Sequence, residues 1–141
     1  MIATLGTILD RTGVGTLGVL DAQVTVPVLA GPQAQGDLIV LPRPAAPPAT
    51  TPIPAVGVTV VRGEAAGNTH SLHSLDGPVS YWQPDVSGGS SGLDLGMLTV
   101  PGGATAYLVH TEEHGANAIA PGTYVIRRQR EMAEEIRLVA D

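Results

Sequence analysis

The sequence has no cysteine, no phenylalanine and no lysine, and each absence narrows what the chain can be. Without cysteine it can form neither disulfides nor thiolate metal sites. Seven Arg stand against 13 acidic residues for a net charge of −6, so the clustered positive charge of a nucleic-acid binder is missing. Only 14% of the residues are charged, against about 25% in an ordinary domain, whereas 43% are hydrophobic. This balance excludes disorder along the whole chain.

The sequence also lacks targeting signals. Residues 1–10 contain no basic stretch, and Asp10 and Arg11 interrupt the first apolar run, so we expect no signal peptide. No stretch approaches eighteen apolar residues free of charges and proline clusters, so no membrane-spanning helix and no membrane partner are expected. We therefore expect a cytoplasmic protein, unless the protein is part of a virus particle.

Glycine and proline are abundant, at 18 and 12 residues, and they separate short runs rich in Val, Ile, Thr and Leu. This pattern predicts an all-β fold, a small antiparallel β-sandwich or barrel. In Gln23–Leu29 the alternation puts Val24, Val26 and Val28 on one face, and Pro27 requires an edge or a bulge. The predicted strands are Ile2–Leu9, Val14–Leu20, Gln23–Leu29, Asp37–Leu41, Val56–Arg62, Val79–Gln83, Leu93–Val100, Ala104–His110 and Gly122–Gln129.

Three segments are expected to lie outside the regular strands of the domain. Residues 1–34 are predicted to form a β-rich N-terminal arm, and residues 35–141 a single β domain. Within that domain residues 42–54 are rich in proline, which predicts an extended polyproline II segment of about 40 Å, either a connector or an arm lying along a partner. Residues 131–141 are predicted to form a short helical or edge segment.

Histidines and acids are the candidate metal ligands. The four histidines fall in two pairs beside acidic residues, a combination that suits Zn, Fe or Mn. On strands, however, the members of the first pair would face opposite sides and those of the second would stand about 13 Å apart. Three interpretations therefore stay open: hydrogen-bonded histidines at strand ends, a shared divalent-metal site, or a pH sensor. The residues of that site would be His70, His73, His110, His114 and Glu64.

No complete catalytic motif is present, so we predict that the protein is not an enzyme and needs no organic cofactor. A metal-binding cupin barrel is the closest comparison. Its first motif requires two His one residue apart followed by Glu, whereas His70 and His73 are two residues apart. Its second motif requires a His where this chain has Ala106. A Ser/His/Asp trio and a G-x-G-x-x-G match at Gly13 lack the surrounding motif that either chemistry needs.

Several strings of residues resemble a family of short uncharacterised proteins found in bacterial and phage genomes. The resemblance covers about three quarters of the chain, begins at Gln35 and implies no established activity. The strings are Gln35-Gly36-Asp37, Gly63-Glu64 through His70, Glu112-Glu113-His114-Gly115, Pro121-Gly122-Thr123-Tyr124, Arg128-Gln129-Arg130-Glu131, Glu134-Glu135-Ile136-Arg137 and Val139-Ala140-Asp141.

The low charge suggests that neighbouring subunits cover much of the surface. Together with extended arms and the phage resemblance, it leads to the hypothesis of a structural protein, a capsid decoration protein. Its expected partners are its own copies, a trimer being favoured, and a major capsid protein. A cupin-like barrel that binds metal or ligand through its His and acids is the alternative. The candidate interface residues are Tyr81, Trp82, Pro47, Pro48 and Ile53.

Overall fold

The fold is seen in a computed structural model of the chain. The structure describes residues 3–12, 25–61, 69–75, 77–85, 92–110 and 115–129. Within these ranges no helix has the length and apolar character needed to cross a bilayer. Predictions for Val14–Leu20, the Gly13 motif and residues 131–141 lie outside the described residues.

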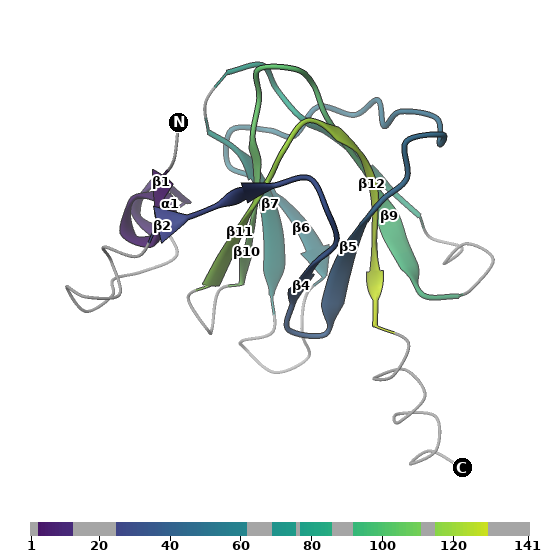
Figure 1. The fold of residues 1–141 in the computed structure, drawn as a ribbon, viewed down its shortest axis with the longest axis horizontal. Helices are drawn as coiled ribbons and strands as arrows, with labels where there is room; N and C mark the ends of the chain where they lie inside the picture. Colours follow the sequence, from purple (N-terminus) through teal and green to yellow (C-terminus); the bar gives the residue numbers. More distant parts are fainter. Residues whose placement is uncertain are drawn as a thin grey trace, which may run out of the picture.

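Two five-stranded sheets form a β-sandwich (Figure 1), which confirms the predicted all-β class. The first sheet has the order β3-β11-β10-β7-β6 and the second the order β4-β5-β12-β9-β8. All neighbouring strands are antiparallel except β3 and β11, which are parallel. The strands of the first sheet are β3 (Val28–Leu29), β6 (Val58–Val61), β7 (His70–Ser74), β10 (Ala106–His110) and β11 (Gly115–Ile119). Those of the second are β4 (Gln33–Gln35), β5 (Leu38–Pro42), β8 (Tyr81–Pro84), β9 (Asp94–Val100) and β12 (Gly122–Arg128).

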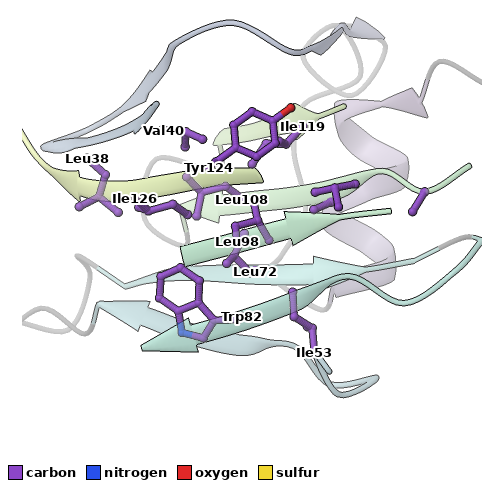
Figure 2. Packing of buried hydrophobic residues seen from close by; sticks show 13 residues of the cluster. Leu38, Val40, Ile53, Leu72, Trp82, Leu98, Leu108, Ile119, Tyr124 and Ile126 are labelled. Carbon is purple, nitrogen blue, oxygen red and sulfur yellow. The ribbon is translucent and has the colours of Figure 1, made fainter. Parts of the chain in front are cut away.

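The core lies between the two sheets, and Figure 2 shows its side chains. Alternate residues of each strand supply it: Leu72 and Leu108 come from the first sheet, and Leu98 and Ile126 from the second, all 0% exposed. Leu98, Leu108 and Ile126 lie in runs that the sequence predicted to be strands. The fold also contains β4, β7 and β11, which the sequence patterns did not predict as strands.

A helix replaces part of the first predicted strand, so the prediction of a strand over Ile2–Leu9 is wrong. Only β1 (Ala3–Thr4) is extended, and it pairs with β2 (Thr25–Val26); α1 (Leu5–Thr12) follows β1 directly. Thr4 caps this helix, because its Oγ1 accepts the Thr7 amide at 3.2 Å.

The helix packs on the outer face of the first sheet. Its apolar residues Ile8 and Leu9 are buried there against Tyr107 and Val109. The residues before position 34 are consequently not an extended arm where the structure describes them. They cover one face of the sandwich and form a second apolar cluster.

The proline-rich segment 42–54 is a connector, one of its two predicted roles, and not a free arm, because it lies on its own sandwich. It runs from β5 across the second sheet to β8 and then enters the core, and Figure 1 shows it as the blue trace above the sheets. Its few amide groups bond to the sandwich: Ala49 N donates to Thr99 Oγ1 at 2.8 Å and Ile53 N to Ser80 O at 2.9 Å. The Ile53 side chain is 3% exposed, and its burial in the core fixes the C-terminal end of the proline-rich segment to the sandwich.

Candidate functional site

Polar side chains line the inner faces of the sandwich at one end, where an apolar core would be expected. Gln33 and Gln35 of β4 are each 7% exposed, His70 of β7 is 1% exposed and His110 of β10 is 3% exposed. His70 and His110 each lie two residues from a core leucine of the same strand, Leu72 and Leu108, so their side chains point inward as the leucines do. Buried polar groups of this kind are stable only if they are hydrogen-bonded.

The two histidines come together because β7 and β10 are antiparallel and pair His70 with His110. Their rings stack with centroids 4.2 Å apart and planes inclined by 6°. Gly36, in the turn between β4 and β5 with φ of +58°, lies against both rings; a Cβ there would be 3.2 Å from His70 Cε1. One member of each sequence pair thus enters a single cluster.

Gln35 fixes the proton on His70. The Gln35 Nε2 atom lies 2.7 Å from the carbonyl oxygen of Leu108, which can only accept, so this atom is the amide NH₂. The Gln35 carbonyl oxygen then faces His70 Nδ1 at 2.9 Å, and that ring nitrogen must donate. The hydrogen-bond network therefore assigns the Nδ1 proton to His70 and turns its Nε2 toward Asp37, 3.6 Å from Oδ1.

Charged residues flank the open side of the cluster. Asp37 is 31% exposed and also pairs with Arg128, whose Nη1 lies 3.3 Å from Asp37 Oδ2. The neighbouring Arg127 forms its own pair with Asp94 of β9, beside a bulge at Leu95 of that strand. Its Nη2 lies 2.6 Å from Asp94 Oδ1, so the two arginines of β12 are neutralised by an aspartate of β9 and an aspartate of the β4–β5 turn.

Asn117 of β11 extends the polar cluster across the sandwich. It accepts a hydrogen bond from Gln35 Nε2 at 2.9 Å and donates to Gln33 Oε1 at 3.3 Å. Gln33 in turn donates to the carbonyl oxygens of Leu29 and Ala118, both at 3.2 Å. Side chains of both sheets therefore bond to one another and to the backbone between them, which fixes the spacing of the sheets at this end.

The third described histidine, His73, lies on the opposite face of β7, as its spacing from His70 predicts. Its Nε2 is 2.8 Å from Ser71 Oγ, and it pairs across the ladder with Tyr107 on the helix-covered face. Burial lowers the pKa of His73 from its ordinary value of 6.5, since the buried ring is poorly solvated when charged. His73 therefore cannot join His70 in one site.

The geometry at His70 and His110 differs from that of a metal centre. Parallel rings stacked at 4.2 Å do not direct two nitrogens at one ion, and no group of three or more His, Asp or Glu able to hold a metal occurs among the described residues. Glu64 and His114, the other residues of the predicted site, lie outside the described residues.

The five candidate interface residues separate into two groups. Trp82 is 4% exposed and Ile53 3%, and both belong to the core of this chain (Figure 2). Trp82 packs directly over Gly96, where a Cβ would come within 2.5 Å of the indole. Tyr81 is half-buried beside Pro52, whereas Pro47 and Pro48 are exposed on the proline-rich segment.

Sequence reasoning missed Gln33, Gln35, Asp37 and Asn117 as members of the cluster. One signal was present: Gln33 and Gln35 are two residues apart in a short run before a strongly apolar strand, the spacing of one strand face. Their inward direction becomes visible only once β4 is paired with β5.

The fold and this polar cluster define a two-sheet β-sandwich with a hydrogen-bonded polar end. The chain belongs to the family described as a domain of unknown function, DUF8820, whose family model matches residues 34–129. The match begins in β4 and ends just after β12. It therefore leaves out β1, α1, β2 and β3, which precede β4 in the chain. This membership confirms the resemblance to an uncharacterised family. Neither a curated protein nor a solved structure matches the chain.

Proposed function

We propose that this protein is a structural component of a virus particle, a capsid decoration protein that acts as a homo-oligomer on the capsid surface. The observation that carries the proposal is the scarcity of charge on the sandwich. In the described part of residues 25–129, the side chains that are charged at neutral pH are Asp37, Arg43, Asp85, Asp94, Arg127 and Arg128.

Most of this small set does not contribute free charge to the surface. Arg127 pairs with Asp94, and Arg128 pairs with Asp37, so two ion pairs neutralise four of the six groups. A domain that faces water alone normally carries about a quarter of its surface as charged residues. A surface of Thr, Ala, Pro and Gly with so few ions suits burial against other subunits.

The buried cluster also supports a structural role. The amide groups of the cluster form hydrogen bonds with one another, with His70 and with backbone carbonyls; these amides belong to Gln33, Gln35 and Asn117. A cluster bonded internally in this way stiffens the sandwich, whereas a catalytic site would leave such groups to a substrate. The proline-rich segment, bound to its own sandwich, stiffens it further. Contacts with a lattice would accordingly be made by the sandwich surface.

A binding experiment tests the proposal. Full-length purified protein would be mixed with particles of a phage that encodes a DUF8820 protein but from which that gene has been deleted, and sedimented through a sucrose cushion. We expect saturable co-sedimentation, with no binding to particles of a phage that lacks the family. Protein that remains in the supernatant at saturating particle concentration would refute the decoration role.

Metal or ligand binding at the polar end is the second candidate, and Asp37 favours it. Its carboxylate lies beside His70 Nε2 at the side of the cluster that is open to solvent. Elemental analysis of the full chain, purified without added metal, tests this candidate. About one equivalent of a transition metal that is lost in His70→Gln would support it, and less than about 0.1 equivalent would exclude a tightly held ion.

A further inference from the structure

The open edges of the two sheets differ in whether another strand can be added to them. β3 is two residues long and follows Pro27, and β4 is three residues long and follows Pro32. β8 is already covered: Trp82 N donates to Thr51 O at 2.8 Å, Pro52 forms a bridge with Tyr81, and Pro84 ends the strand. Proline residues, a short strand and a covering segment are the usual features that prevent an edge strand from pairing with another chain.

β6 is the exception among these edges. It consists of Val58-Thr59-Val60-Val61, all β-branched and uncharged, and it pairs with β7 on one side. Among the described residues no strand pairs with its other side. Thr59 is exposed on the outer face, and Val56, two residues before the strand, is the most exposed large apolar side chain described, at 87%. Exposed β-branched edges of this kind accept a further strand.

We propose that β6 is a self-association surface, at which β6 of a second copy of this chain adds antiparallel across a two-fold axis. This inference rests on the proposed function, because the pairing is short and the close spacing of copies on a lattice would strengthen it. A two-fold axis perpendicular to the sheet requires one residue to pair with its own counterpart. With Thr59 on the axis, Thr59 faces Thr59 of the partner subunit, and Val58 faces the partner subunit's Val60.

In this register, side chains on the same face of the joined sheet are of the same type in both copies. Val58 and Val60 pack on the inter-sheet core, so valine meets valine on the inner side and threonine meets threonine outside. No charged side chain lies on β6, so pairing two copies of this edge brings no like charges together on it. The bulge between Thr59 and Val61 keeps the pairing short, and the dimer correspondingly weak.

Sedimentation velocity of the full chain tests the inference, over about 10 μM to about 1 mM, a range suited to a weak dimer. The wild-type average mass should rise from monomer toward dimer. Thr59→Lys should weaken association at least tenfold, because the two new charges meet at the axis. Thr25→Lys is the matched control, since Thr25 is an exposed strand threonine of β2, and it should behave as wild type. Equal urea midpoints for the variants would show that both are folded.

Two results would overturn the inference: a wild-type protein that stays monomeric across this range, or Thr59→Lys that associates as strongly as wild type. The capsid assay separates this failure from failure of the proposed function. Capsid binding that persists without β6 association refutes the edge alone, whereas β6 association without capsid binding supports the edge and refutes decoration.

Discussion

His70 and His110 stack ring on ring inside the sandwich, with centroids 4.2 Å apart, because the antiparallel register of β7 and β10 places them opposite each other. Both side chains are almost completely buried, and they lie at the end of a core that is otherwise built of leucine, isoleucine and valine. Gln35 makes this burial tolerable for His70, since it bonds to Nδ1 and connects the ring to the rest of the polar cluster.

Replacing Gln35 should therefore destabilise the fold strongly. Gln35→Ala leaves His70 Nδ1, the Leu108 carbonyl and Asn117 without this partner, and we expect a loss of about 3 kcal/mol in the free energy of unfolding. Urea denaturation at neutral pH measures it. Gln83→Ala is the control, because Gln83 is exposed and bonds only to Thr50 and Thr51 in the described structure; it should cost under about 0.5 kcal/mol. Equal losses for the two variants would contradict the role of Gln35.

Tyr124 ties the start of β12 to the turn before it. Its hydroxyl donates to the Ala120 carbonyl at 2.6 Å, and its ring packs against Gly122. Removal of this hydroxyl in Tyr124→Phe should cost about 1 kcal/mol in the free energy of unfolding, because a partly buried carbonyl loses its donor. Tyr81→Phe, at a half-buried tyrosine on β8, should be nearly neutral. Thermal and urea unfolding compare the two, and a neutral Tyr124→Phe would argue against the bond.

Ile53 anchors the proline-rich segment to the core. Ile53→Ala should lower the free energy of unfolding by about 2 to 4 kcal/mol, since it empties space between the sheets. Val56→Ala, three residues later and largely exposed, should change it by less than about 0.5 kcal/mol. Limited proteolysis adds a local readout: cleavage within residues 42–54 should accelerate in Ile53→Ala alone. An Ile53→Ala protein as stable as wild type would mean that the segment is not fixed by this side chain.

Protonation of His73 should destabilise the protein in acid. Its pKa is lowered in the folded state by burial, so the unfolded chain binds the proton more readily. The stability contributed by the neutral ring is complete above the ordinary pKa of 6.5 and is lost as the pH falls through that value toward the folded pKa. Urea midpoints measured from about pH 7.5 to pH 5 should fall less steeply for His73→Gln than for wild type. Identical slopes would contradict this assignment.

The sequence predicted the sandwich well where short apolar runs are separated by glycine and proline. β9, β10 and β12 lie within predicted runs, and β5 extends one residue beyond its run, to Pro42. The prediction of a strand over Ile2–Leu9 was wrong because its apolar spacing fits a short strand or a helix, and Thr4 caps a helix there. The sequence did not decide whether the proline-rich segment is a connector or an arm, because its contacts are with Thr99, Ser80 and Trp82, which are distant in sequence.

The polar cluster was only partly predictable. His70 and His110 stand out by composition, but their contact depends on the register of two strands, which no local pattern specifies. Gln35 and Asn117 carry no chemical signature of their own. They become part of the cluster because β4 and β11 approach each other from different sheets at this end.

The central claim, that neighbouring subunits cover this sparsely charged surface, is tested most directly by counting the protein in virus particles. Quantitative mass spectrometry of density-purified particles, from a phage that carries this gene, measures its copies relative to the major capsid protein. The account predicts a fixed, near-stoichiometric ratio that survives repeated purification. Particles without the protein, with all of it recovered free in the lysate, would contradict the account.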